Sequence, residues 1–254
     1  MPDPKVSIVI LNYQSPEVID VCLRTLEITG GIDYETVVVD NGSEPHVVEA
    51  LRQHHKEGRI TTLVESPENL YFSGGNNLGK RHANPASEYI LLLNSDVGFL
   101  RPDWLTKLVG WMEGTTEYRP TVWASKPTTP SPGPRDLVSC GWSHDANVEP
   151  GHIRPEGWCM LIRRTVWVDL NEAMPWHGGF EWAVSTAIRR GAKCGVLFNY
   201  APFLVHREGG SGRAATPATY REQPDYAAMF NGLDVEGLDF SLGPDEHSSY
   251  LRWD

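Results

Sequence analysis

The sequence has few cysteines and no long apolar run. Its four cysteines are scattered among 254 residues without a Cys-x-x-Cys pair, which favours buried thiols in a reducing compartment. A membrane-spanning helix needs roughly 18 or more apolar residues, and the most apolar stretch, residues 89–93, is far shorter. The opening residues lead straight into an apolar strand-like run without the core of a signal peptide. We therefore expect a cytoplasmic protein.

The chain also lacks a basic segment. Its formal net charge of −11 divides into −7 for residues 1–100, +2 for 101–215 and −6 for 216–254. Nucleic-acid-binding proteins usually carry a basic face, and membrane-surface proteins carry a basic amphipathic helix. The sequence shows neither, which disfavours both kinds of partner. An acidic chain can still bind a phosphorylated small molecule where a metal ion or backbone amides neutralise the phosphate.

Strand-like and helix-like segments alternate over the first hundred residues. Hydrophobic residues are 40% and charged residues 22% of the chain, as in ordinary folded proteins. We expect strands at 6–11, 36–39, 60–64 and 89–93, and helices beginning at 16, over 45–57 and over 76–83. The strands are continuously apolar, as strands covered on both faces are. This order predicts an α/β fold with a single Rossmann-like, mostly parallel sheet flanked by helices.

The pattern is less regular beyond residue 100. We expect helices at 102–113 and 179–190, strands at 121–125, 157–162, 193–199 and 203–206, and a proline-rich loop at 127–134. The last residues are polar and acidic. The predicted organisation is one domain over 1–215, with a ligand-binding half at 1–100 and a second half at 101–215, followed by an acidic tail at 216–254.

Polar clusters stand where the predicted strands end. They are Asn12-Tyr13, Asp40-Asn41-Gly42-Ser43 and Asn94-Ser95-Asp96, and a fourth cluster, Ser73-Gly74-Gly75-Asn76-Asn77-Leu78-Gly79, opens a helix. Ligands of open parallel sheets bind beyond the carboxyl ends of the strands. Each cluster also has a local interpretation: a turn at Asp40, a loop and helix cap at Gly75, and a cap for the next helix at Asp96. Their convergence on one edge favours a ligand site.

In combination, these segments resemble glycosyltransferase family 2. The similarity rests on 6–13, 37–43, 74–79 and 91–96 in the family's order and spacing, is strongest over 5–100, looser over 155–212, and is closest to rhamnosyl- and galactofuranosyltransferase-like members. It implies a GT-A fold and an inverting transfer from a nucleotide-diphosphate sugar (UDP-, dTDP- or GDP-linked) to an acceptor hydroxyl, for example on a glycan. Nucleic acid is disfavoured as the acceptor but stays open.

The resemblance implies a role for individual residues. Asp40 would bind the nucleotide base, with Asn12 and Tyr13 lining the same pocket, and Gly75, Asn76 and Asn77 would lie near the diphosphate or the donor sugar. Asn94 and Ser95 would lead to Asp96, the main carboxylate ligand of Mg²⁺ or Mn²⁺. His206 would be a further metal ligand, and Gly210 and Ser211 would donate to phosphate. A partly buried histidine beside a loop is the alternative for His206.

The catalytic base is assigned by the same resemblance to Glu181, while Trp182 occupies the position of a second acid. An inverting transfer needs one base to take the proton of the acceptor hydroxyl. Glu181 could instead only cap its helix, and Asp169 and Asp145 are the other candidates for the base.

Two further sets of residues carry two interpretations each. One set either shapes an acceptor pocket or packs in the core: Trp158, Trp176, His177 and Trp182. The other set, Arg163 and Arg164, either contacts a phosphate or faces solvent.

The sequence therefore predicts a metal-dependent sugar transferase, with two alternatives. A sugar nucleotidyltransferase would need a glycine-rich basic loop after the first strand, where Asn12-Tyr13-Gln14-Ser15-Pro16 contains neither glycine nor a basic residue. A non-catalytic member of the same fold, binding a nucleotide sugar or nothing, is the second alternative. Replacement of Asp96 distinguishes a catalyst from such a member.

Overall fold

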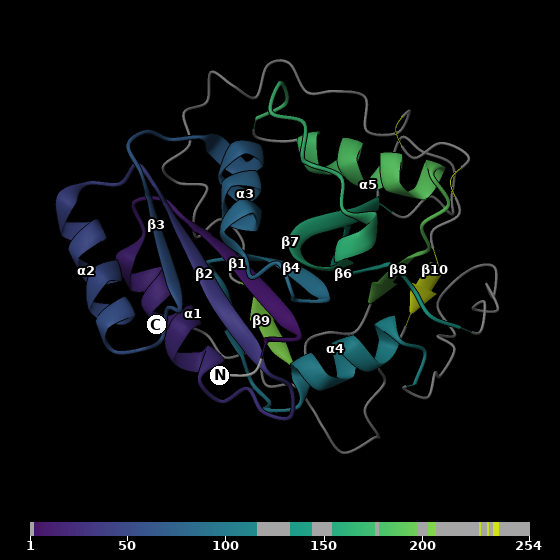
Figure 1. The fold of residues 1–254 in the computed structure, drawn as a ribbon, viewed down its shortest axis with the longest axis horizontal. Coiled ribbons are helices and arrows are strands. Elements are labelled where there is room, and N and C mark those ends of the chain that lie inside the picture. Colours follow the sequence, from purple (N-terminus) through teal and green to yellow (C-terminus); the bar gives the residue numbers. More distant parts are fainter. Residues whose placement is uncertain are drawn as a thin grey trace.

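The computed structural model describes residues 3–115, 133–143, 154–175, 178–197, 203–206, 229, 233 and 236–238. An eight-stranded sheet in the order β10-β8-β6-β7-β4-β1-β2-β3 forms its centre (Figure 1). Its strands are β1 (Val6–Asn12), β2 (Tyr34–Asn41), β3 (Thr62–Ser66), β4 (Tyr89–Asn94), β6 (Leu137–Ser143), β7 (Arg154–Arg163), β8 (Cys194–Leu197) and β10 (Glu236–Leu238). Of these strands only β7 runs antiparallel to its neighbours. The predicted mostly parallel sheet is confirmed.

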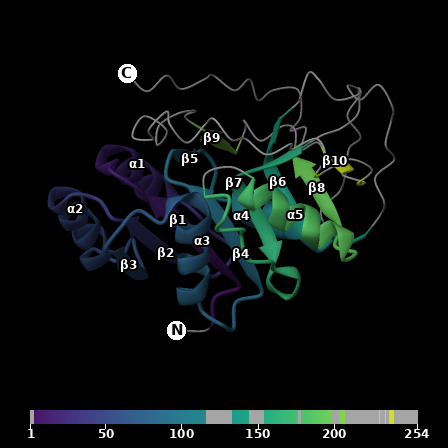
Figure 2. The same ribbon diagram turned by 90° about the horizontal axis from the view of Figure 1, so that it is seen from above.

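Helices cover both faces of the sheet (Figures 1 and 2). They are α1 (Pro16–Leu26), α2 (Pro45–Lys56), α3 (Tyr71–His82), α4 (Trp104–Met112) and α5 (Gly179–Arg189), with a 3₁₀ turn at Arg164–Val166. α1, α2 and α4 pack on one face, while α3 and α5 pack on the other. Successive residues of β1 serve the two layers, because Ile8 and Ile10 join the first core and Val9 joins the second. This explains why the strand is apolar throughout.

The third helix begins earlier than the sequence predicts. It starts at Tyr71 rather than at residue 76, so the glycine pair lies inside the helix. A Cβ on Gly75 would stand 2.4 Å from Cδ1 of Leu11, and one on Gly79 would stand 2.4 Å from Cγ1 of Val9. These glycines let α3 approach β1 closely, which outweighs their low helix propensity. The third strand is likewise shifted, to Thr62–Ser66 from 60–64.

A separate two-stranded sheet lies beside the carboxyl end of β4. β5 (Val97–Phe99) pairs antiparallel with β9 (Leu204–His206), and Val97 is the partner of His206. The strand expected at 203–206 is thus confirmed, whereas β5 and β6 were not expected. The strand expected at 121–125 lies outside the described residues. The β5–β9 pair brings His206 beside the polar residues that follow β4.

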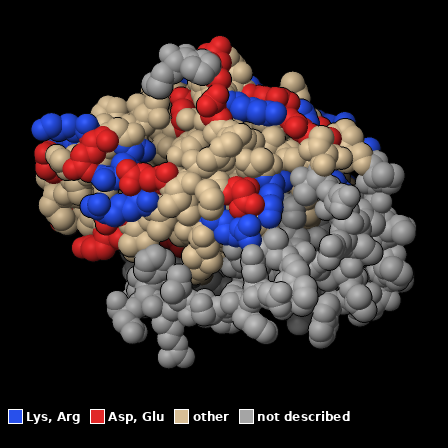
Figure 3. All heavy atoms as spheres, turned by 90° about the horizontal axis from the view of Figure 1, so that it is seen from below, with Lys and Arg blue, Asp and Glu red and all other residues tan. Residues whose placement is uncertain are grey.

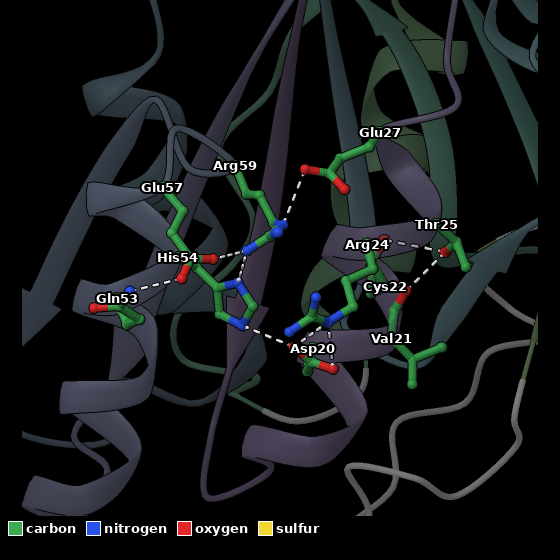
Figure 4. A network of polar contacts seen from close by, with 10 residues as sticks. All are labelled: Asp20, Val21, Cys22, Arg24, Thr25, Glu27, Gln53, His54, Glu57 and Arg59. Atoms are coloured by element: carbon green, nitrogen blue, oxygen red, sulfur yellow. Dashed lines mark hydrogen bonds and ion pairs between the residues drawn. The ribbon is translucent and has the colours of Figure 1, made fainter.

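A polar network joins α1 to α2 on the first face (Figure 4). His54 is 7% exposed, and its Nε2 lies 3.2 Å from Oδ1 of Asp20. Arg59 lies beside the other ring nitrogen and pairs with Glu27 at 2.9 Å. Burial lowers the pKa of His54, the negative charge of Asp20 opposes this shift, and Arg59 adds to it. The network holds α2 against α1 and lies apart from the polar strand ends.

The four cysteines are buried and form no disulfide, as expected. Burial raises the pKa of the Cys22 thiol to about 12, and the negative charge of Asp96 contributes to the shift. The pKa of Cys159 is raised by its hydrogen bond with Cys140 and by burial. At neutral pH the thiols of Cys22 and Cys159 are therefore protonated and behave as small apolar groups.

Candidate active site at the carboxyl edge of the sheet

The carboxyl ends of three central strands meet at one edge. β1 lies between β2 and β4, with Asn12 opposite Asp40 and Leu11 opposite Asn94. β7 runs the other way, so its first half reaches the same edge, with Cys159 opposite Leu93. The predicted convergence of the clusters at Asn12, Asp40 and Asn94 is present in the structure.

Buried polar atoms without hydrogen-bond partners gather at this edge. Within the described residues they are Nδ2 and Oδ1 of Asn12, Oδ1 of Asp40, Oγ of Ser95 and Oδ1 of Asp96. None of the four side chains is more than 6% exposed. A buried polar group without a partner costs about 1–3 kcal/mol, so such groups are uncommon and call for an explanation. A polar ligand reaching this edge would supply the missing partners.

Asp40 combines a structural bond with an unused oxygen. Its Oδ2 accepts a hydrogen bond from the backbone N–H of Ser43 at 3.1 Å, which is the turn interpretation of this segment. Gly42 between them has φ +76°, and a Cβ there would stand 2.6 Å from the carbonyl carbon of Glu68. The turn thus occupies one carboxylate oxygen, and Oδ1 remains for a ligand.

Asn41 ties the start of α3 to the end of β2, a role that the sequence analysis did not identify. Its Nδ2 donates to Oδ1 of Asn69 at 2.8 Å and to the carbonyl of Tyr71 at 3.2 Å, and its Oδ1 accepts from the N–H of Leu70 at 2.9 Å. Tyr71 has φ +57°, the left-handed region that favours glycine. These bonds hold the strained backbone of Tyr71, an exposed tyrosine, at the end of β2.

The amides of α3 make bonds within the protein. Asn76 donates to the carbonyl of Phe72 at 2.9 Å, one turn earlier. Asn77 donates to the carbonyl of Leu170 and to Glu172, both at 2.9 Å, and accepts from the N–H of Leu170. Asn77 therefore fastens the segment that precedes α5 onto α3. Their expected contact with a donor molecule stays a prediction, as does that of Gly75, which packs on β1.

Asp96 and His206 form a pair at the junction of the two sheets. Nε2 of His206 lies 3.4 Å from Oδ1 of Asp96, an ion-pair distance without hydrogen-bond geometry. The side chain of Asp96 is 2% exposed and that of His206 is 13% exposed. The ring of His206 stacks on Trp158, which is buried. Two residues predicted as metal ligands from distant parts of the sequence are thus brought together.

Glu181 occupies the first turn of α5. Its Oε2 accepts the backbone N–H of Gly178 at 2.8 Å, and Gly178 has φ +83°. This is the capping contact that the sequence offered as the alternative to a catalytic base. Asp169, another candidate base, is exposed and accepts a hydrogen bond from Trp167. Trp182 is exposed beside Glu181, whereas Asp145, Trp176, His177, Gly210 and Ser211 lie outside the described residues.

Arg163 and Arg164 lie at the opposite edge of the sheet. Arg163 donates to Glu88 at 2.7 Å, and Arg164 donates to the carbonyl of Ser87 at 2.7 Å. Burial lowers the pKa of Arg164 although the nearby Glu35 charge opposes the shift. Both guanidinium groups are therefore engaged at the amino ends of β2 and β4. The phosphate contact considered for them from the sequence has no support in this placement.

The surface of the described residues carries mixed charges. On the face shown in Figure 3, basic and acidic side chains lie side by side rather than in separate fields. Opposite charges also pair directly among the described residues, as Arg52 does with Glu65 at 2.7 Å. Within the described part of the chain, no helix has the length and apolar character needed to cross a membrane.

Two solved structures have a fold similar to that of this chain. A mannosyltransferase, PcManGT from Pyrobaculum calidifontis, solved with GDP-Man and Mn²⁺, matches with a TM-score of 0.55 and 17% identity over 76% of this chain and 54% of its own. TarS 1–349 from S. aureus in complex with UDP matches with a TM-score of 0.52 and 13% identity over 72% and 54%. The chain thus spans about half the length of these two proteins. The common architecture is the GT-A fold.

Comparison at the level of sequence identifies the family. A search of the curated proteins gives no match. The family model described as "Glycosyl transferase family 2" matches residues 7–164, from the second residue of β1 through the end of β7. Because this match covers more than half of the 254 residues, the chain belongs to glycosyl transferase family 2.

Proposed function

We propose that this protein transfers a sugar, with inversion, from a nucleotide-diphosphate sugar to an acceptor hydroxyl. The observation that carries the proposal is the set of buried polar atoms on Asn12, Asp40, Ser95 and Asp96 at the carboxyl edge that have no hydrogen-bond partner within the described part of the chain. The family supports sugar transfer, and the structural relatives solved with GDP-Man or UDP support a nucleotide-linked donor. UDP-, dTDP- and GDP-linked hexoses and deoxyhexoses, including those of the rhamnosyl and galactofuranosyl branch, are the donors to test.

The base of the nucleotide would bind at the ends of β1 and β2. Oδ1 of Asp40 can accept an N–H of the base, and the amide of Asn12 offers both a donor and an acceptor. Tyr13, half-buried after Asn12, would line the same pocket. Asn94, Ser95, Asn76 and Asn77, with Gly210 and Ser211, remain proposed contacts to the donor. The acidic chain can accept this anion because its charges need not face the phosphates.

Asp96 and His206 would hold a divalent metal ion. A carboxylate oxygen and an imidazole nitrogen suit Mn²⁺, and the carboxylate also suits Mg²⁺. The buried Oδ1 of Asp96 faces Nε2 of His206 and has no hydrogen-bond partner in the residues that the structure describes, which fits this use. Such an ion, when bound, neutralises the charge that develops on the diphosphate leaving group. Two protein ligands leave positions for phosphate oxygens, so the donor would complete the site.

Glu181 is the proposed base that takes the proton of the acceptor hydroxyl. One of its oxygens caps α5 through Gly178, which fixes the carboxylate in place. Glu181→Gln separates the two roles, because the amide oxygen can still accept the Gly178 N–H but cannot take a proton. We expect Glu181→Gln to fold with unchanged stability and to lose sugar transfer. Full transfer by this variant would move the base to another residue, Asp169 being the first alternative.

A non-catalytic nucleotide-sugar-binding protein is the second candidate function. The observation that favours it is the capping bond of Glu181, because a helix cap alone explains an acid at this position. Such a protein would bind the nucleotide through Asp40 and Asp96 but would release none from any donor.

The deciding experiment measures nucleotide release from UDP-, dTDP- and GDP-sugars with Mn²⁺ or with EDTA. We expect slow hydrolysis of one donor that requires the metal and disappears in Asp96→Asn. Asp103→Asn is the matched control and should leave turnover unchanged. Asp103 precedes α4 and pairs with Arg101, just before it, and with Lys107 in the helix. Nucleotide binding without release, under acceptor screening as well, would favour the non-catalytic protein. Absence of both binding and release would overturn both functions.

A further inference from the structure

We propose that Trp158 is a positioning residue that holds the ring of His206 in place against Asp96, and thereby sets the affinity of the metal site; this rests on the proposed function. The indole and imidazole rings are stacked, with centroids 4.3 Å apart and planes 7° from parallel. Trp158 is 6% exposed. The stack is therefore a buried contact with defined geometry rather than a surface encounter.

His206 needs such a support because its own strand is short. β9 has three residues and pairs with β5, outside the eight-stranded sheet. Trp158 instead belongs to β7, a ten-residue strand within that sheet. The stack thus connects the ring of His206 to the most extensive hydrogen-bonded layer of the protein. Asp96 immediately precedes β5, the partner of β9, so the two-stranded sheet places both backbones, whereas the face of the imidazole ring is held from the larger sheet.

The indole of Trp158 packs against the backbone of β6 at Gly141. A Cβ on Gly141 would stand 2.0 Å from Nε1 of Trp158, so any other residue at position 141 would clash with the indole and displace it. Gly141 follows an irregularity in the pairing of β6 with β7, between Ser139 and Gly141. The hydroxyl of Ser139 secures this irregularity: its Oγ lies 2.8 and 2.7 Å from the carbonyl oxygens of Gly141 and Glu156, which share its single proton, and it accepts the N–H of Gly141 at 3.1 Å. Gly141, the first residue of β6 that pairs with β7 after this irregularity, therefore provides the space in which the indole lies.

Stacking is the form of support that leaves metal ligation possible. The lone pair of an imidazole nitrogen lies in the plane of the ring, whereas Trp158 contacts the face. The face contact restricts tilting of the ring and directs its edge, with Nε2, to Asp96 at 3.4 Å. Groups that orient metal ligands change metal affinity by about 10–100-fold when they are replaced. Trp158 would act by this route without touching the metal or the donor.

The test is the affinity for Mn²⁺, measured from the free-ion electron paramagnetic resonance signal in the presence of UDP or GDP. We expect Trp158→Leu to weaken binding by about 10-fold or more. Trp158→Phe keeps an aromatic face and should stay within about threefold of the wild type. Gly141→Ala, which displaces the indole without altering either ring, should resemble Trp158→Leu. Trp111→Phe, at another buried tryptophan on α4, is the control for lost core packing and should bind as the wild type does.

Each result has a distinct meaning. Equal affinity of Trp158→Leu and the wild type, with binding lost in Asp96→Asn, would overturn the role of Trp158 and leave the metal site intact. Absence of Mn²⁺ binding by the wild type would overturn the metal site, and the role of Trp158 with it. If Trp158→Leu does not fold, the comparison of Trp158→Phe with Gly141→Ala decides, because only the latter should lose affinity.

Discussion

The two edges of the central sheet treat buried polar groups differently. At the amino edge, Ser7 donates to Glu35 at 2.5 Å, its Oγ is paired with that of Ser87 at 2.7 Å, and the N–H of Asn84 also donates to Glu35. Arg164, in the 3₁₀ turn that follows β7, closes this network. At the carboxyl edge, the side chains of Asn12, Ser95 and their neighbours are equally buried, yet five of their polar atoms have no hydrogen-bond partner among the described residues.

This difference separates groups that stabilise the fold from groups kept for a ligand. A paired buried network contributes to stability in the absence of any ligand. Unpartnered groups lower the stability of the free protein and gain partners only on binding. The comparison therefore predicts opposite effects of substitution at the two edges: loss of stability at the amino edge, and loss of binding at the carboxyl edge.

Glu35→Ala tests the amino edge and has the largest expected effect. It removes the acceptor of Ser7 and of the Asn84 N–H and leaves Arg164 without its nearby negative charge. We expect the free energy of unfolding to fall by roughly 3 kcal/mol, measured by urea denaturation. Glu35→Gln keeps an oxygen acceptor and should lose less. Nucleotide affinity should not change in either variant, and a change would show that the two edges are not independent.

Tyr71 sharpens the comparison at the carboxyl edge, where the backbone is strained as well. The left-handed conformation costs a non-glycine residue about 1–2 kcal/mol, and glycine adopts it freely. We expect Tyr71→Gly to raise the free energy of unfolding by up to about 1 kcal/mol after the entropy cost of glycine. Tyr71→Ala keeps the strain and loses the ring, so it should lower stability. A stability loss in both variants would mean that ring contacts outweigh the strain.

His54 gives the smallest effect and lies away from both edges, between α1 and α2 (Figure 4). Its pKa is lowered by burial, so the unfolded chain binds a proton that the folded protein resists. The stability it supports is present above its unfolded pKa, near 6.5, and declines as pH falls below that value. His54→Gln should reduce the loss of stability between about pH 7 and pH 5.5, measured by thermal unfolding. An unchanged pH profile would assign the loss to other groups.

Strand ends were predictable from the sequence, whereas contacts between distant segments were not. The apolar runs of β1, β2 and β4 predict buried parallel strands, and these in turn place Asp40 and Asp96 at one edge. The start of α3 was predicted wrongly, because the role of Gly75 depends on the side chain of Leu11 across the layer. A local pattern of glycines and asparagines does not contain that information.

The same limit applies to β5 and to the stack on His206. β5 has three residues, and its partner β9 follows about a hundred residues later, so no periodicity indicates it. Trp158 was considered for an acceptor pocket or for the core, and the structure places it in the core, against His206. The place of Gly141 against its indole follows from the irregular pairing of β6 with β7. Pairing of this kind is set by the fold as a whole.

Asn12→Leu is the most direct test of whether the buried polar side chains at the carboxyl edge serve a ligand. Leucine is close to asparagine in shape and removes two buried polar atoms that have no partner within the described residues. We expect the free energy of unfolding to rise by about 1 kcal/mol, and the affinity for UDP or GDP with Mn²⁺, measured by calorimetry, to fall by about 10-fold or more. Lower stability with unchanged nucleotide affinity would show that Asn12 serves the fold and not a ligand.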